Sequence, residues 1–315
     1  MKRIILFTLA LVLALSLCAC RDRKEAEQTA AEPTAAPSPV PTPEPTPAPA
    51  EAVRASMEAL QTLESEHAST EIEFEATVHL ESKETPEEQH VKAAVQAETD
   101  YTASPYIMRG TLTYALYASY ELGPEEIPFC VWNQDGKTCY AIRYTSMDKW
   151  IGSTFKNSGL GLLQNALGDY HTFLSDWAEQ FTLVGEDTIN GEPVTVYEAV
   201  FEGDALRKLV EMYSVGDGEP LITFTDELLN ELPGVRHRIA IDANGRPVYQ
   251  EIDAAAFLSK LLERLLPEND FHIDKLLIKG TLSDFNAVGP LEIPEEVVLE
   301  DYATAFSSLA GLLAY

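Results

Sequence analysis

Apolar and polar side chains alternate over several stretches of the chain, the pattern of β-strands with one buried and one solvated face. The clearest stretch is 71–80, where five apolar side chains share one face and five polar ones the other. The apolar set is Ile72, Phe74, Ala76, Val78 and Leu80. Residues 91–97 and 108–120 repeat the alternation. Each stretch predicts a strand.

Three pairs of turn-forming residues predict three hairpins. Asp135-Gly136, Asn190-Gly191 and Asn244-Gly245 are residue pairs that readily adopt the positive φ angles of such turns. The last two turns separate strand-like runs, 182–187 from 194–201 and 237–242 from 248–252. A further strand pair is predicted from 275–282 and 291–298.

Helices are predicted between the strands, where apolar residues recur every three or four positions. They cover 53–64, 163–181, 204–214, 257–266 and 302–313. Strands outnumber helices and hairpins connect most of them. The sequence therefore predicts an α+β domain with an antiparallel sheet.

The N-terminus has the pattern of an export signal. Lys2 and Arg3 precede an apolar run that ends at Leu17 and is too short to span a bilayer comfortably. The sequence Leu17-Cys-Ala-Cys20 resembles the lipobox of bacterial lipoproteins, with leucine at −3 and a small residue at −1. That resemblance implies a signal peptide at 1–19 and acyl chains, palmitate among them, on Cys20.

The segment 20–50 is predicted to tether the folded domain to the membrane. Residues 33–50 are almost only proline, alanine, threonine and serine, which cannot form a core and favour extended polyproline geometry. At ~3.1 Å per residue this stretch reaches roughly 50–60 Å. The folded domain is then expected at 51–315.

The charge of the chain excludes one class of partner. It carries 22 basic and 51 acidic residues, a formal charge of −29. Nucleic acid binds to a basic surface, so this acidic chain is not expected to bind nucleic acid. Anionic lipid head groups also attract basic surfaces, so the folded domain is not expected to lie on them. No run after the signal reaches the ~18 apolar residues of a membrane helix. The acyl chains on Cys20 are thus the expected membrane contact.

Two cysteines follow the signal, Cys130 and Cys139, on either side of the Asp135-Gly136 turn. A two-residue turn places them diagonally, whereas a four-residue turn from Asn133 to Gly136 places them face to face, as a disulfide needs. Both registers remain open from the sequence, so the disulfide is a possible one. Without histidines nearby, the pair is a poor zinc site.

No catalytic motif has its full context. Ser153 and Lys156 form the S-x-x-K of penicillin-binding enzymes, but Asn-Ser-Gly follows at once and would end the helix that this mechanism needs. Six histidines are scattered without ligand spacing. His237 lies between two arginines and is predicted to be an exposed strand residue. The sequence therefore predicts no enzyme, cofactor or metal site.

Apolar side chains provide the remaining candidate site. Residues of one predicted strand face could lie opposite two helical stripes, leaving either a filled core or an apolar pocket for an acyl chain. The residues are Tyr106, Met108, Leu112, Tyr114, Leu116, Trp177 and Leu262. The same side chains serve both alternatives.

Several segments together resemble the LolA/LppX-like lipoproteins, including uncharacterised surface lipoproteins of Gram-positive bacteria. They are the lipobox, the first helix and its alternating strands, the Tyr140 strand leading to Asp148-Lys149-Trp150, the hairpins at 188–192 and 242–247, and the closing segment 282–295. The likeness covers most of residues 51–298.

The resemblance implies a strongly curved antiparallel sheet, a half-barrel, with helices packed on its concave face. It also implies an extracytoplasmic, membrane-anchored protein that binds a lipid or another apolar ligand between sheet and helices. The alternative is a non-catalytic interaction or sensor module with a filled core, which contacts another cell-envelope protein at the cell surface.

Overall fold

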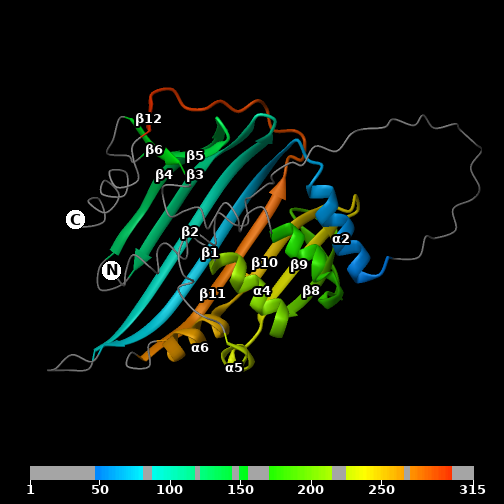
Figure 1. Ribbon diagram of the computed structural model, residues 1–315, viewed down its shortest axis with the longest axis vertical. Helices are drawn as coiled ribbons and strands as arrows, with labels where there is room; N and C mark the ends of the chain where they lie inside the picture. Colours follow the sequence, from blue (N-terminus) through cyan, green and yellow to red (C-terminus); the bar gives the residue numbers. More distant parts are fainter. Residues whose placement is uncertain are drawn as a thin grey trace, which may run out of the picture.

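The computed structural model describes residues 47–80, 87–117, 121–143, 149–154, 170–214, 225–265 and 270–299. Within them, twelve strands form one open, twisted sheet in the order β12-β6-β5-β4-β3-β2-β1-β11-β10-β9-β8-β7 (Figure 1). The strands are β1 (Ser65–Leu80), β2 (Glu87–Ala103), β3 (Tyr106–Tyr117), β4 (Glu121–Gln134), β5 (Lys137–Ile142), β6 (Trp150–Thr154), β7 (Thr182–Ile189), β8 (Glu192–Phe201), β9 (Val235–Asp242), β10 (Pro247–Asp253), β11 (Asp270–Ser283) and β12 (Val297–Leu299).

Neighbouring strands are antiparallel except at one edge, where β12 runs parallel to β6. The predicted α+β class with a curved antiparallel sheet is confirmed. The predicted strand pair 275–282 with 291–298 is wrong. Residues 275–282 lie in β11 and pair with β1 and β10, whereas Val297–Leu299 crosses to the far edge and pairs with β6.

The hairpin predictions are confirmed. At Asp135-Gly136 the φ angles are 52° and 69°, and at Asn190-Gly191 they are 52° and 85°. Both residues of each turn are thus left-handed, which aspartate, asparagine and glycine tolerate and which matches the twist of the flanking strands. The third turn, with Gly245 at φ 76°, connects β9 to β10.

The sheet has two different faces. We call the side of Ile72, Phe74 and Val95 the inner face and the side of Glu71 and Glu73 the outer face. Strand β1 alternates between them, so its inner side chains are buried and its outer glutamates are half-buried.

Helices pack on the inner face. They are α2 (Pro49–Leu60), a helical segment at 170–176, η2 (Ala178–Gln180), α4 (Gly203–Ser214), α5 (Asp226–Glu231) and α6 (Ala255–Leu265). Val53 and Met57 of α2 and Leu258 and Leu261 of α6 are buried in the same core as the inner-face side chains. Helix α2 begins at Pro49, so the last two residues assigned to the tether are helical. Residues 163–169 of one predicted helix lie outside the described residues, and so does the whole of the helix predicted at 302–313.

A second, smaller core lies on the outer face, over β3 to β6. Ile107, Trp132 and Trp150 are buried there, and Leu291 and Val297 pack against them. The chain reaches this face after β11, where Asn286 accepts a hydrogen bond from Glu64 N at 2.7 Å and donates one to Ser65 O. The segment between β11 and β12 therefore contributes Leu291 to this smaller core.

Candidate functional site

The inner face of β1 to β5 is a continuous apolar surface. The register places Ile72 beside Val95 and Val95 beside Tyr114. Further rows are formed by Leu112 with Ile127 and by Val131 with Tyr140. Each row spans neighbouring strands, so this face has the shape and composition that an apolar ligand needs.

The described helices do not cover this whole face evenly. Helix α6 packs on β11, and α2 and η2 lie over β7 to β10. Toward the Leu80 end of β1, the inner-face side chains of β2, β3 and β11 are only half-buried: Val91, Ala93, Leu116 and Phe271. Leu262 of α6 is half-buried and Leu265 is exposed. We give the name α6 trough to this set of half-buried apolar side chains on β2, β3 and β11 together with Leu262 and Leu265 of α6, which packs on β11.

A polar pair lies inside this apolar surface. The Tyr114 hydroxyl donates a hydrogen bond to Glu125 Oε2 at 2.7 Å, and both side chains are on the inner face of β3 and β4. Burial and the neighbouring carboxylate raise the pKa of Tyr114, so its hydroxyl keeps its proton. An amphipathic ligand lying against the apolar strands would find a hydrogen-bonding group here. No pattern in the sequence predicts this pair, because it depends on the register of two strands.

The seven candidate lining residues come from three parts of the fold. Tyr106, Met108, Leu112, Tyr114 and Leu116 share the inner face of β3, as their alternation predicts. Leu262 is on α6, over β11, whereas Trp177 packs near Phe173, which contacts Phe201 of β8. At about 4.8 Å per strand, β8 is roughly 29 Å along the sheet from β3. Trp177 therefore belongs to the packing of the other half.

His237 is buried, and the prediction that it is an exposed strand residue is wrong. Its side chain lies on the inner face, 1% exposed, with the Tyr170 hydroxyl 3.3 Å from Nδ1. The rings of Phe181 and Phe201 lie 5.9 and 6.0 Å from it. Burial lowers its pKa to about 3, so the ring is neutral at ordinary pH. The alternation with Val235, Ile239 and Ile241 was the sequence signal for this placement.

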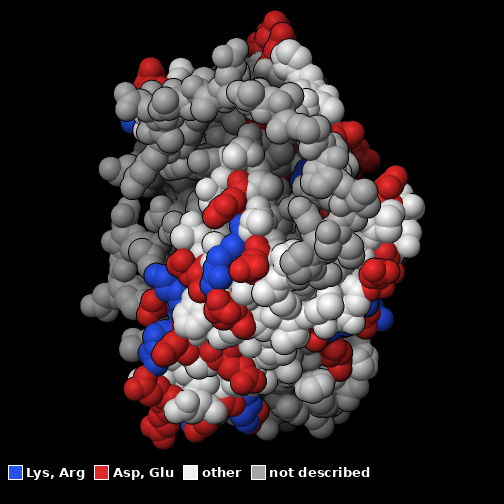
Figure 2. Space-filling view, turned by 90° about the vertical axis from the view of Figure 1, so that its right-hand side faces the viewer, with Lys and Arg blue, Asp and Glu red and all other residues white. Residues whose placement is uncertain are grey.

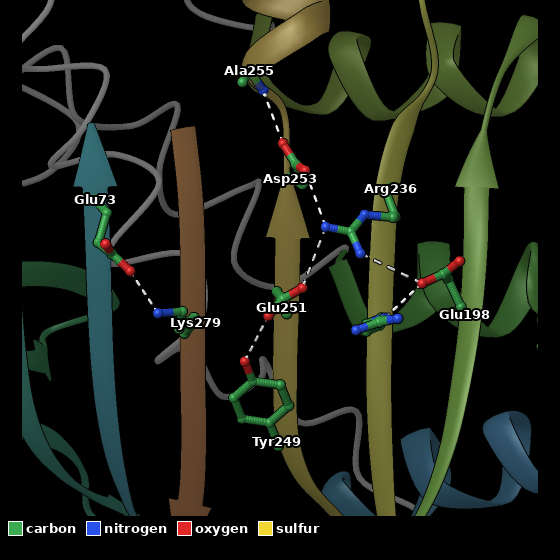
Figure 3. A network of polar contacts seen from close by, with 9 residues as sticks. Glu73, Glu198, Arg236, Tyr249, Glu251, Asp253, Ala255 and Lys279 are labelled. Atoms are coloured by element: carbon green, nitrogen blue, oxygen red, sulfur yellow. Dashed lines mark hydrogen bonds and ion pairs between the residues drawn. The ribbon is translucent and has the colours of Figure 1, made fainter. Parts of the chain in front are cut away.

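The arginines that flank His237 face outward and hold an ionic network over β8 to β10 (Figure 3). Arg236 Nη2 lies 3.0 Å from Asp253 Oδ2, and Arg238 Nε lies 2.6 Å from Glu198 Oε2. On β1 and β11, Lys279 Nζ is 2.5 Å from Glu73 Oε1. Surface ion pairs of this kind contribute about 0–1 kcal/mol each. The network pairs acidic and basic side chains of neighbouring strands on the outer face.

Cys130 and Cys139 are both buried, free thiols on the outer face. Gln134 pairs with Lys137, so the turn has two residues and Cys139 lies opposite Trp132, diagonal to Cys130. Diagonal neighbours are about 7–8 Å apart, beyond the range of an unstrained disulfide. The disulfide stays a prediction, one that this register disfavours.

Ser153 lies in strand β6 on the inner face, 2% exposed, and pairs with Tyr140. An S-x-x-K nucleophile begins a helix, so this serine lacks the required backbone. Lys156 lies outside the described residues, as does Cys20. Within the ranges that the structure describes, no three His, Cys, Asp or Glu side chains gather as metal ligands, and no helix is long and apolar enough to cross a membrane.

No protein-family model matches the chain, and no curated protein sequence matches it. Among solved structures, the chain is similar to the lipoprotein LppX of Mycobacterium tuberculosis, with 16% identity and a TM-score of 0.39 over 77% of this chain and 97% of that one. It is similar to LprF from Mycobacterium bovis, with 16% identity and a TM-score of 0.39 over 81% and 98%. A putative outer membrane lipoprotein-sorting protein domain from Vibrio parahaemolyticus matches at 9% identity and a TM-score of 0.17, over 71% and 87%.

These matches agree with the resemblance to LolA/LppX-like lipoproteins predicted from the sequence. Because the identities are below 25% and the TM-scores below 0.5, no ligand or cellular role is carried over from those proteins.

Proposed function

We propose that this protein is a membrane-anchored, extracytoplasmic lipoprotein that binds a lipid or another apolar ligand in the α6 trough. The observation that carries the proposal is the half-buried set of apolar side chains at one end of an otherwise buried inner face. Soluble proteins bury such sets unless they serve an interaction. The neighbouring Tyr114–Glu125 pair supplies a polar contact of the kind that orients a bound ligand.

The anchor is the acylated Cys20 of the predicted lipobox, followed by the proline-rich segment. Two or more acyl chains hold a protein stably at a membrane, whereas one chain does not. Metabolic labelling with radioactive palmitate tests this part: the Cys20→Ser variant is expected to lose the label. A variant labelled as heavily as the parent would refute acylation at Cys20. The proposed ligand site has its own test.

A charge placed in the α6 trough tests ligand binding. Leu116 points to the inner face, and its neighbour Tyr117 on the same strand is 42% exposed. Leu116→Glu places a carboxylate beside the apolar ligand, where an unpaired charge is costly. Tyr117→Glu is the matched control, because it adds the same charge one residue away, on the opposite face.

The measurement is a fluorescence titration of purified full-length protein with cis-parinaric acid, a fatty acid whose emission rises in an apolar site. We expect saturable binding to the parent and to Tyr117→Glu, and binding at least about tenfold weaker in Leu116→Glu. Absence of binding to the parent, or equal binding to both variants, would contradict the proposal. Absence of binding would favour the alternative function, an interaction or sensor module with a filled core.

That alternative has one observation in its favour. At the other end of the inner face, Tyr101, Met108 and Val131 are buried, so this region is filled. Native mass spectrometry of protein extracted from membranes separates the two functions. A reproducible mass increment that organic extraction removes is expected for the ligand-binding protein.

A further inference from the structure

Strand β8 extends past its edge partner. The last pair between β7 and β8 is Thr182 with Glu198, yet β8 continues to Phe201. In the part of the chain that the structure describes, Ala199 to Phe201 have no partner strand on that side. A hollow of about 430 Å³ occupies this place. Its lining residues are Gln180, Thr182, Glu198, Ala199, Val200 and Glu202.

Apolar side chains are exposed at this part of the sheet edge. Val200, which lines the hollow, is 47% exposed, and Leu183 and Val184, which follow the lining residue Thr182 on β7, are 53% and 52% exposed. Natural proteins usually protect a sheet edge with charges, proline or a covering segment, because an open edge can pair with another strand. An apolar edge next to an unfilled strand position is therefore suited to receive one.

The carboxylates of the hollow differ in their partners. Glu198 is neutralised by Arg238 and Arg236, whereas Glu202 makes no ion pair with any described residue. A Cβ at Gly234 would lie 2.6 Å from both Glu202 Cγ and Val200 Cγ1, so the absence of a side chain there lets these two side chains lie over the backbone. Glu202 thus borders the hollow, and among the described residues no cation forms an ion pair with it.

We propose that this edge binds an extended segment of another protein in which basic and apolar residues alternate, added as a strand beside β8. In a strand paired at this position, the residue opposite Val200 points to the outer face and has Glu198 and Glu202 as diagonal neighbours. Diagonal neighbours are about 7–8 Å apart, within reach of a lysine or arginine side chain. The residues on either side of it point toward the buried Ala199 and Phe201, so they are apolar.

Charge excludes a second copy of this chain as the occupant. Glu186 and Asp187 follow along β7, and the same edge of another copy would bring like charges opposite one another, which destabilises strand pairs. The right-hand side of Figure 1, where β8 and α2 lie, faces the viewer in Figure 2, and acidic side chains predominate over basic ones there. The chain as a whole carries −29, so a basic partner is also favoured at long range.

The probe is a fluorescein-labelled peptide of alternating valine and lysine, six residues long, titrated with purified full-length protein at low ionic strength and followed by fluorescence anisotropy. Two further peptides accompany it. One replaces each lysine by glutamate, and the other carries an N-methyl group on every backbone nitrogen, so that neither of its edges can donate the hydrogen bonds of a strand pair. Glu202→Lys reverses the charge at the site, and Glu295→Lys is the matched control at a remote exposed position.

We expect saturable binding of the lysine peptide, lost with the glutamate and N-methyl peptides. Glu202→Lys should weaken it at least about tenfold and Glu295→Lys less than about twofold, although both variants change the net charge equally. Equal weakening by both variants would mean general attraction to an acidic protein and would overturn the proposal. Undiminished binding of the N-methyl peptide would overturn it too. Parinaric acid binding should not change in Glu202→Lys, so this proposal and the proposed lipid site fail separately.

Discussion

Replacing His237 by phenylalanine is expected to change how the stability of the protein depends on pH. The imidazole is buried among the rings of Tyr170, Phe181 and Phe201, with centroids 5.8, 5.9 and 6.0 Å away. Phenylalanine can take this aromatic position but cannot be protonated. The variant loses the contact with the Tyr170 hydroxyl at every pH, so the pH dependence isolates the protonation.

The magnitude follows from the difference between folded and unfolded pKa values. Burial lowers the pKa of His237 to about 3 in the folded protein, from 6.5 in the unfolded chain. Below 6.5 the unfolded chain binds one proton more than the folded one, so the free energy of unfolding falls by about 1.4 kcal/mol per pH unit. This loss continues down to the folded pKa. Between about pH 7 and about pH 5 it amounts to about 2 kcal/mol.

Urea unfolding of both proteins, followed by circular dichroism at pH 7 and at pH 5, measures this effect. The parent should lose about 2 kcal/mol more than His237→Phe over this interval. The comparison does not depend on the folded pKa being 3.0, because any value well below 5 gives the same difference. Carboxylates that titrate in this range contribute equally to both proteins and cancel.

His67→Gln provides a control with the opposite sign. Burial lowers the pKa of His67, but hydrogen bonds and charges of Asp100 and Glu98 outweigh it and raise the pKa overall. Its stabilising contribution is present below the unfolded pKa and is lost as pH rises through the folded pKa. His67→Gln should therefore lose more stability than the parent on going from pH 7 to pH 5. An equal pH dependence in the parent and His237→Phe would refute the buried, neutral state of His237.

Two further predictions concern packing. A Cβ at Gly110 would collide with the carbonyl oxygen of Glu98 and lie 3.0 Å from Phe129 Cζ, so Gly110→Ala should lower the free energy of unfolding by about 1–3 kcal/mol. Gly289→Ala, which meets nothing within 4 Å, should change it by less than about 0.5 kcal/mol, and equal urea midpoints for both variants would contradict this reasoning. Cys130 and Cys139 are buried, and burial raises the pKa of Cys130 to about 11. An alkylating reagent should therefore modify both thiols only after the protein is unfolded, and no reductant should be needed. Peptide mapping that finds both unmodified until a reductant is added would instead establish the disulfide.

Much of the fold could be predicted because its signals are local. The alternation in β1, the left-handed turns at Asp135-Gly136 and Asn190-Gly191, and the apolar stripe of α6 each depend on a few adjacent residues. The shared face of Tyr106 to Leu116 was predictable for the same reason, since side chains of one strand alternate whatever the strand pairs with.

The candidate site was predictable only in part. Periodicity identified apolar faces but not which faces meet, so Trp177 was grouped with a strand that lies roughly six strand positions away from its own packing partners. The Tyr114–Glu125 pair and the diagonal cysteines depend on register, which the hairpin sequence left open. The prediction that His237 is exposed is wrong because it followed from the two charged neighbours, whereas the alternation with Val235 and Ile239 places this side chain on the inner face.

The sequence by itself determined that this protein is built of amphipathic strands joined by tight turns, with an acidic outer surface and an N-terminal lipobox-like motif. Only the tertiary structure decided that β12 pairs with β6, that β8 extends past β7, and that α6 packs on β11. The physical reason is the range of the interactions. Turn and strand preferences act between neighbouring residues. Strand pairing and burial depend on contacts between segments that are distant along the chain, and the free energy of those contacts depends on how all the strands assemble.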